Sequence, residues 1–328
     1  MGYFYKENKA LEQLIDSYFK GIEKYSNENS DGLLSVILLG SLSRGEATWI
    51  ETKNGPLMVS DIEFFTVYPE GFSDLKGYLE YCDNVANEVF GKDNSSLFHI
   101  DNALVCVNSL ALLERKLLTY DAKRMGKTVV GKDYISLIPE INLKNINLWD
   151  IKDILTHRVF SALYYGLPLK NAGNEAEYRY NIAKNSLDLM TVMLVNHKIL
   201  ESGFINRLKI IKTLDIDEKF KNYFEFCLSV KLGSDCDYSF TTEEMEDLFI
   251  MLVKDLKKKF RMPLSNVFIN AKFVTRRALG IVKRALKYKK FPSSRHLSSL
   301  IKSFEQKTPL SDAQKKLNLV INGYPLEK

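Results

Sequence analysis

Two carboxylates, Asp61 and Glu63, stand two residues apart at the start of an apolar stretch that ends at Tyr68. In a β-strand, residues i and i+2 project from the same face, so both carboxylates would point one way while Ile62 and Phe64 face the core. Like charges held side by side resist ionisation, and a divalent cation removes that conflict. Mg2+ takes one or two carboxylates together with phosphate oxygens and water. The spacing therefore predicts a metal site that also binds phosphate.

A turn that suits phosphate precedes the acid pair. The apolar run at residues 36–39 leads directly into Gly40 and Ser41, and Ser43 and Arg44 follow. A glycine lets the backbone approach an anion closely, and backbone N–H groups at a turn entering a helix attract anions. The hydroxyls and the guanidinium add further donors. We therefore predict that these four residues hold the phosphates of a nucleotide.

Each part of this pattern also has an ordinary explanation. A Gly-Ser pair after an apolar run is commonly only a turn, and an Asp-x-Glu triplet commonly lies at an exposed strand edge. Arg44 and Glu46 alone have the pattern of a solvated ion pair. The order of the parts favours the functional interpretation, because a strand, a Gly-Ser turn, a spacer and an acid pair entering a strand seldom occur together by chance.

The segments GSLSRGE (residues 40–46) and SDIEF (residues 60–64) together resemble the nucleotidyltransferase fold of DNA polymerase β-like enzymes. That superfamily includes aminoglycoside nucleotidyltransferases, poly(A) and CCA-adding polymerases, and small transferases paired with helical toxin partners. The resemblance implies that Gly40 and Ser41 hold a triphosphate and that the two acids bind Mg2+. It covers residues 33 to about 105 and does not identify the acceptor.

Many members of the superfamily have a third metal-binding acid on a later strand. Asp101, in an apolar stretch at residues 98–105, is the best match in this chain. Glu88, Asp83 and Glu114 are alternatives, although they lie in segments with helical patterns. By the resemblance, Asp101 completes the metal site and helps to deprotonate the acceptor.

The chain departs from the family pattern in two ways. The spacer between the Gly-Ser turn and the acid pair is longer than is common, and it contains Asn-Gly-Pro at residues 54–56, which indicates a hairpin tip. Glu63 stands where aspartate is commoner, which keeps the charge and lengthens the reach.

Composition and length indicate an ordinary globular protein. The chain has 328 residues, 45% of them hydrophobic, which is enough for two domains. Its four cysteines are far apart and lack CxxC spacing, which argues against a zinc site and favours a reducing compartment. No signal-peptide pattern and no membrane-spanning stretch is visible, so the chain is predicted to be cytoplasmic.

Helical and strand patterns alternate over the first 140 residues. Helices are expected at 5–25, 74–90 and 110–121, and strands at 33–39, 58–68, 97–107 and 128–133. This alternation predicts a catalytic domain at residues 1–140 with a small mixed sheet.

Helical patterns dominate from residue 141 onward. Helices are expected at 150–165, 174–201, 204–213, 217–230 and 241–260, the last with a cap at Thr241. The predicted fold class is therefore α+β, with a nucleotidyltransferase domain followed by an α-helical bundle domain at 141–328. Lys184 is a candidate for contacting the triphosphate, and a solvated lysine is the commoner alternative.

A basic segment follows the last expected helix. Residues 271–302 contain ten lysines and arginines and no acid, with apolar residues on one helical face. The segment could pack on the bundle with a solvated face, lie on the inner membrane surface, or bind a polyanion. Nothing in the chain resembles an RNA-binding module, so no specific nucleic acid partner is predicted.

These patterns predict a Mg2+- or Mn2+-dependent nucleotidyltransferase that moves a nucleoside monophosphate from an NTP to a hydroxyl or phosphate acceptor and releases pyrophosphate. The resemblance is greatest to bacterial enzymes that modify small molecules, including precursors of surface polysaccharides. Two alternatives stay open. One is an antitoxin-like transferase that modifies a protein, and the other is a nucleotide-binding scaffold without catalysis.

Overall fold

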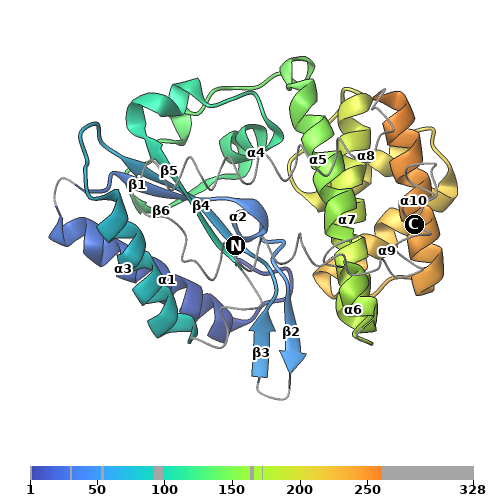
Figure 1. Cartoon of the computed structure of the whole chain (residues 1–328), viewed down its shortest axis with the longest axis horizontal. Coiled ribbons are helices and arrows are strands. Elements are labelled where there is room, and N and C mark those ends of the chain that lie inside the picture. Colours follow the sequence, from blue (N-terminus) through green and yellow to red (C-terminus); the bar gives the residue numbers. More distant parts are fainter. Residues whose placement is uncertain are drawn as a thin grey trace, which may run out of the picture. The chain divides into compact units, whose positions relative to one another are not determined.

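The computed structural model describes residues 2–29, 32–52, 55–91, 99–162, 166–171 and 173–260 (Figure 1). Of these, 2–151 and 186–240 form one compact unit, and 152–185 and 241–260 form another. This division by compactness groups residues 186–240 with the first unit, and the predicted domain boundary at residue 140 stays a prediction. The basic segment at 271–302 lies outside the described residues.

The described residues of the first unit form six strands. They are β1 (Ser35–Leu38), β2 (Trp49–Thr52), β3 (Gly55–Met58), β4 (Ile62–Tyr68), β5 (Ile100–Cys106) and β6 (Lys127–Gly131). Four of them form a mixed sheet in the order β5-β4-β1-β6, in which β4 and β5 run parallel and the other pairs run antiparallel. The predicted strands are confirmed with shorter bounds, except that the stretch 58–68 divides between β3 and β4.

The strands β2 and β3 form a separate antiparallel hairpin before β4. Glu51 pairs with Pro56 and Thr52 with Gly55, so the chain turns where the Asn-Gly-Pro pattern predicted a hairpin. Residues 53 and 54 at the tip lie outside the described part of the chain. The long spacer between the Gly-Ser turn and the acid pair is therefore a folded hairpin.

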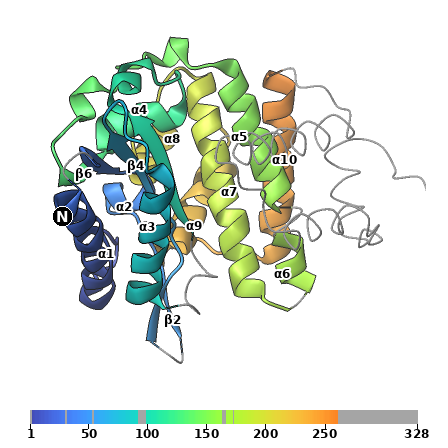
Figure 2. The same cartoon turned by 60° about the vertical axis from the view of Figure 1, so that its left-hand side comes forward.

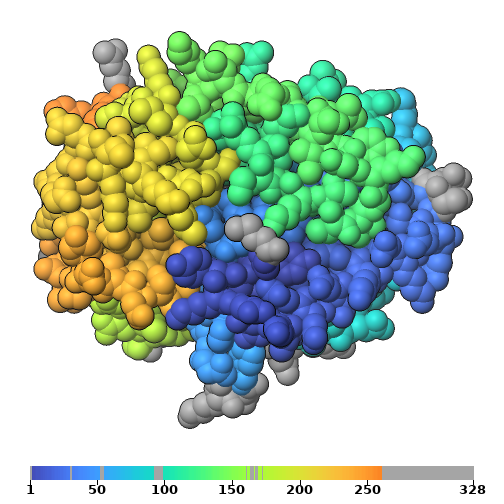
Figure 3. All heavy atoms as spheres, turned by 180° about the vertical axis from the view of Figure 1, so that it is seen from behind, coloured from blue at the N-terminus to red at the C-terminus, as the bar shows by residue number. Residues whose placement is uncertain are grey.

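Two helices, α1 (Lys9–Glu28) and α3 (Leu75–Phe90), lie side by side over one face of the sheet (Figures 1 and 2). Asn8 and Asp74 cap their first turns, as each side chain accepts a backbone N–H. Tyr18 and Phe19 of α1 pack edge-on against the ring of Phe64 in β4. The outer side of α1 lies at the molecular surface, dark blue in Figure 3. This packing buries the face of β4 that was predicted to be apolar.

A second apolar cluster covers the opposite face of the sheet, where Leu39, Phe65 and Val67 are buried. The helix predicted at 110–121 is wrong in detail, since a 3-10 helix η2 (Val107–Leu112) and helix α4 (Leu117–Met125) take its place. The Leu117 N–H donates to the Asp150 carboxylate at 2.8 Å, which fixes the start of α4 from a distant segment. A sequence pattern cannot show such a cap.

Helices α8 (Phe204–Thr213) and α9 (Glu218–Leu232) belong to the first unit together with the end of α7 (Glu175–Asn196). The hydroxyls of Ser186 and Tyr223 share a hydrogen bond at 2.7 Å, joining α7 to α9. The predicted bounds of α8 are confirmed, and those of α7 and α9 differ by a few residues at their ends.

The second unit contains most of α5 (Leu148–Ser161), α6 (Leu167–Asn171), the first part of α7, and α10 (Thr242–Lys259) (Figure 2). Glu246 of α10 joins α7 through the Tyr178 hydroxyl, at 2.9 Å, and α6 through Lys170. The predicted cap is confirmed as a capping box between Thr241 and Glu244. All regular elements among the described residues after 140 are helices, as predicted.

Candidate active site

The Gly-Ser turn lies where β1 ends. Because β1 and β4 are antiparallel and Leu38 pairs with Phe64, the end of β1 lies beside the start of β4. The Leu39 N–H donates to the carbonyl of Glu63 at 2.7 Å. The chain then enters the short helix α2 (Gly40–Arg44). Strand pairing therefore brings the predicted phosphate turn and the predicted metal acids to one place.

Gly40 and Glu63 are in direct contact. Gly40 has φ +66°, in the left-handed region that favours glycine. A Cβ built on Gly40 would lie 1.9 Å from Oε2 of Glu63, so the carboxylate rests against the bare Cα. A glycine is required here for both its conformation and its lack of a side chain.

Asp101 lies directly opposite Glu63 in the parallel pair β4–β5. Directly paired residues project from the same face, so the two carboxylates are neighbours. Glu63 is half-buried, whereas Asp101 is exposed on the edge strand. Asp61 precedes β4, and its Oδ1 accepts the backbone N–H of His99 at 3.0 Å, just before β5. The three predicted acids therefore lie at the start of two adjacent strands.

The alternative third acids lie elsewhere. Asp83 and Glu88 are on α3, which covers the opposite face of the sheet from Glu63. Glu114 follows η2 and forms an exposed ion pair with Lys116 at 2.6 Å. Asp101 is the acid in register with Glu63, although its role as a metal ligand stays a prediction.

The donor set suits a hard divalent cation, because Mg2+ requires only one or two carboxylates when substrate phosphates and water supply the remaining oxygens. In the described part of the chain, no three acidic, histidine or cysteine side chains are already gathered closely enough to hold a metal ion. The pair Glu63 and Asp101, with Asp61 beside it, therefore fits a cation that arrives with a nucleotide. The predicted three-ligand site stays a prediction.

Two of the predicted phosphate ligands have other partners. Ser43 is buried, and its hydroxyl donates to the Gly40 carbonyl at 3.0 Å, within the turn itself. The Arg44 side chain is 8% exposed, and its Nε contacts Glu46 at 2.9 Å. The alternative explanation of Arg44 and Glu46 as a solvated pair is wrong, since their side chains are 8% and 3% exposed. Ser43 and Arg44 each have a partner inside the protein, and their predicted roles as phosphate ligands stay predictions.

Three predicted phosphate-binding residues remain, namely Gly40, Ser41 and Lys184. Gly40 and Ser41 are half-buried and stay accessible candidates for phosphate binding. Lys184 lies on α7 in the second unit, and its predicted contact with the triphosphate stays a prediction.

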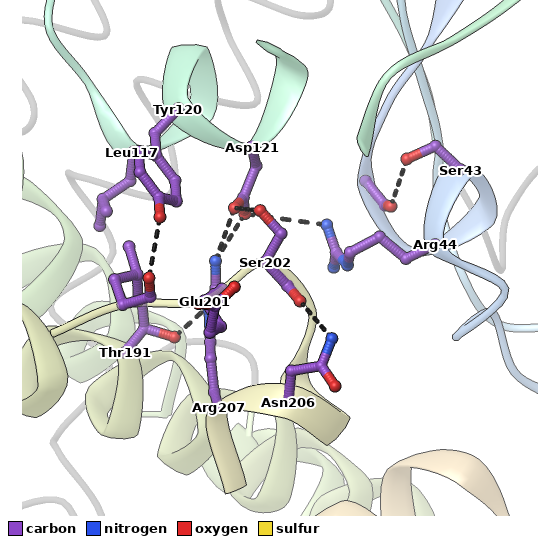
Figure 4. A network of polar contacts seen from close by, with 12 residues as sticks. Ser43, Arg44, Leu117, Tyr120, Asp121, Thr191, Glu201, Ser202, Asn206 and Arg207 are labelled. Atoms are coloured by element: carbon purple, nitrogen blue, oxygen red, sulfur yellow. Dashed lines mark hydrogen bonds and ion pairs between the residues drawn. The ribbon is translucent and has the colours of Figure 1, made fainter. Parts of the chain in front are cut away.

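A buried ion cluster adjoins the turn, and sequence reasoning missed it (Figure 4). One Nη of Arg207 reaches both oxygens of Asp121, at 2.7 and 2.8 Å, and Arg44 lies 3.9 Å from the same carboxylate. Burial lowers the pKa of Arg44, but the Glu46 and Asp121 carboxylates raise it by more, to above its ordinary value. The partners are about 80 to 160 residues apart in the sequence, so no local pattern could have revealed them.

Burial raises the pKa of the Glu46 carboxyl, but Arg44 and the backbone N–H groups of Phe204 and Ile205 lower it by more. The net pKa is below the ordinary range, so Glu46 is ionised at neutral pH. The ion cluster is therefore a set of fixed charges next to the turn, formed by Arg44, Glu46, Asp121 and Arg207.

Comparison with known proteins gives limited information. No protein-family model matches the chain, and no curated protein matches it. Among solved structures it is similar to a spectinomycin adenyltransferase from Enterococcus faecialis, determined with ATP and spectinomycin. That chain is 15% identical with a TM-score of 0.47, and the match covers 76% of this chain and 98% of the other. Values this low transfer no property between the two proteins.

A small cavity of about 220 Å3 lies elsewhere in the first unit, lined by Lys6, Ala47, Thr48, Trp49, Glu51, Leu232 and Gly233. Its polar groups are largely satisfied, since the Trp49 indole donates to the Lys6 carbonyl at 2.9 Å. The Thr48 N–H donates to the Ser60 hydroxyl at 2.8 Å, which ties one cavity wall to the segment that carries Asp61.

Among the described helices, none combines the length and apolar character needed to cross a membrane.

Proposed function

We propose that this protein is a metal-dependent nucleotidyltransferase. It moves a nucleoside monophosphate from an NTP to a hydroxyl or phosphate acceptor and releases pyrophosphate. The observation that carries this proposal is the convergence at one sheet edge of the Gly40 turn, the Glu63 carboxylate against it, and Asp101 in register beside it. A turn that admits an anion next to a group of carboxylates suits a nucleotide bound with its metal.

The chain's own residues would divide the work as follows. The backbone of Gly40 and Ser41 binds the β and γ phosphates, which leaves the α phosphorus towards the acids. Asp61 and Glu63 hold Mg2+, which when bound neutralises phosphate charge and aligns the reacting oxygens. Asp101, exposed on the edge strand, takes the proton of the acceptor hydroxyl.

The reaction itself is a displacement at phosphorus. The acceptor oxygen forms a bond to the α phosphorus as the bond from that phosphorus to the bridging oxygen breaks, and pyrophosphate leaves. Positioning and electrostatics supply most of the catalysis in such reactions. Strand pairing supports such positioning, because the backbone of β4 holds the turn and the acids in a fixed relation to each other.

We propose a small molecule or a surface-polysaccharide precursor as the acceptor and the cytoplasm as the location. Asp101 and Ala103 are both exposed on the edge strand β5, which leaves the proposed acceptor side of the acid pair open. The basic segment at 271–302 is proposed as a contact for the inner membrane surface or another polyanion, on its sequence alone.

A pyrophosphate-release assay tests the proposal. Each of the four NTPs is offered with Mg2+ or Mn2+ and a pool of small-molecule acceptors from cell extract. We expect release with at least one NTP and a loss of at least about a hundredfold in the Asp61→Asn/Glu63→Gln variant, because the metal-binding charge is removed. Asp101→Asn alone tests the third acid in the same assay.

Glu88→Gln is the matched control, since it neutralises an exposed acid on α3, over the opposite face of the sheet. Its rate should equal that of the wild type. Wild-type release no greater than that of the Asp61→Asn/Glu63→Gln variant, with every nucleotide and metal, would show that the protein is not a nucleotidyltransferase.

A further inference from the structure

One buried residue, Glu46, joins the proposed nucleotide turn to two helices from much later in the sequence. Glu46 is 3% exposed, and each of its four polar atoms has a partner. Its N–H donates to the Ser41 carbonyl at 2.9 Å, and its own carbonyl accepts Lys231 Nζ of α9 at 2.9 Å. Its Oε2 accepts Arg44 Nε at 2.9 Å, and its Oε1 accepts the Ile205 N–H of α8 at 3.0 Å.

The hydrogen bonds of Glu46 fix the second end of the turn, whereas β4 fixes the first. The first end is fixed by the Leu39 N–H on the Glu63 carbonyl, at 2.7 Å. The other end closes where the Glu46 N–H meets Ser41, after Gly45 has reversed the chain with φ +70°. The turn is therefore fixed at one end by the sheet and at the other by the backbone of Glu46 and by its carboxylate on Arg44.

The Glu46 carboxylate takes the place of a side-chain cap at the start of α8. The residue before α8 is Gly203, which has no side chain to cap the first turn, and its Cα lies against Glu46. The Glu46 carboxylate accepts a backbone N–H there, which is where a negative charge stabilises a helix. The Phe204 ring sits among three cations, with Arg44 at 5.5 Å, Arg207 at 5.6 Å and Lys231 at 5.7 Å from its centroid. The first turn of α8 is thus built around Glu46.

We propose that Glu46 is a positioning residue that couples nucleotide binding at the turn to the order of the first turn of α8. This inference rests on the proposed function, because it needs a nucleotide at Gly40 and Ser41. A nucleotide that favours one conformation of the turn stabilises the Glu46 contacts, and by linkage an ordered α8 strengthens nucleotide binding. The sites communicate through one side chain and need no large movement.

Steady-state kinetics of Glu46→Gln give the first test, with the nucleotide that turns over in the pyrophosphate assay. The glutamine oxygen can still accept the Ile205 N–H, but the charge that holds Arg44 is lost. We expect the KM for the nucleotide to rise about tenfold, a typical size for coupling between two sites. A residue with only a structural role would reduce the folded fraction and leave KM unchanged.

Arg207→Lys is the matched control. It disturbs the same buried cluster through Asp121, Thr191 and the Glu201 carbonyl. Arg207 faces the turn indirectly, through Asp121, which lies 3.9 Å from Arg44, and a lysine keeps the positive charge that faces Asp121. We expect its KM to stay within about twofold of the wild type. Both variants are assayed at a temperature at which circular dichroism shows them folded.

Amide hydrogen exchange of the wild-type protein gives the second test and needs no variant. Adding the nucleotide with Mg2+ and no acceptor should slow exchange at Ile205 by about fivefold or more, although Ile205 is not in the proposed site. Normal turnover with unchanged KM in Glu46→Gln and unchanged exchange at Ile205 would overturn the inference and leave the proposed function standing. Absence of wild-type turnover and nucleotide binding would overturn both.

Discussion

The sheet-edge acids and the ion cluster around Glu46 use the same residue types in opposite surroundings. At the edge, Glu63 and Asp101 are like charges in register, and one of them is exposed. In the cluster, Glu46 is 3% exposed and Asp121 17% exposed, and each faces an arginine within 3 Å. Neighbouring carboxylates at a strand edge suit a cation, whereas each carboxylate of the cluster is matched by an arginine. The two regions therefore differ in how their negative charges are arranged.

The same comparison divides one heptapeptide, GSLSRGE. Gly40, Ser41, Ser43 and Arg44 were predicted together as phosphate ligands, yet they have different surroundings. Gly40 and Ser41 belong to the edge, while Ser43, Arg44 and Glu46 face inward and bond to the protein. Charge and hydrogen-bonding capacity alone did not indicate which residues meet the ligand, because burial decides that.

The largest expected effect lies in the cluster. Arg207→Met leaves the Asp121 carboxylate, which is only 17% exposed, without its closest partner, at 2.7 Å, and should lower the free energy of unfolding by about 3–5 kcal/mol. Urea denaturation followed by circular dichroism measures the loss. Lys212→Met, on the same helix α8, is the control, because its ion pair with Glu225 is 47% and 33% exposed and should contribute about 0–1 kcal/mol. Equal losses in the two variants would erase the distinction between buried and exposed charge.

The next largest effect is expected from a substitution at the sheet edge, and it should lower activity more than stability. In Gly40→Ala, the new Cβ would push the Glu63 carboxylate by about 1.5 Å, the difference between 1.9 Å and an ordinary contact of 3.4 Å. A displacement of this size in a catalytic group costs about a hundredfold in rate. The carboxylate is the free end of a side chain and can move, so the stability cost should be only the backbone strain of about 1–2 kcal/mol.

Gly233→Ala is the control for that strain. Gly233 has φ +63°, close to Gly40, but no atom lies within 4 Å of its added Cβ. Both variants should lose similar stability, and only Gly40→Ala should lose pyrophosphate release. A similar loss of activity in both would mean that backbone strain, and not the contact with Glu63, is what matters at Gly40.

Much of the fold followed from local pattern, and its limits are physical. Strands β1, β4, β5 and β6 and helices α1 and α3 were predicted because one face of each is apolar at the correct period. The pairing of Thr241 with Glu244 was visible because a capping box is local. The start of α4 was misplaced because its cap is Asp150, 33 residues away.

The candidate site divides in the same way. The i, i+2 spacing of Asp61 and Glu63 needs only knowledge of a strand, and Asp101 could be matched through the family pattern. The partners of Glu46 on α8 and α9 are 159 and 185 residues away, so their contacts depend on tertiary packing. Glu46 itself looked like half of a surface pair, and nothing short of the folded structure distinguishes a buried glutamate from an exposed one.

The smallest expected effect is a difference in acid stability, and it tests whether Glu46 is ionised inside the protein. Its pKa is lowered on folding despite burial, because Arg44 and the N–H groups of α8 favour the charged form. A carboxyl with a depressed folded pKa stabilises the protein above its unfolded pKa of about 4.3, and this contribution is lost as pH falls towards the folded value.

The Glu46→Gln variant has no titratable group at this position. The stability gap between wild type and Glu46→Gln, measured by urea denaturation, should therefore be constant above about pH 5 and shrink below about pH 4. Other carboxyls titrate equally in both proteins and cancel in the difference. A gap that stays constant down to pH 3 would mean that the Glu46 charge contributes nothing to folding, and that the cluster differs from the sheet edge in burial alone.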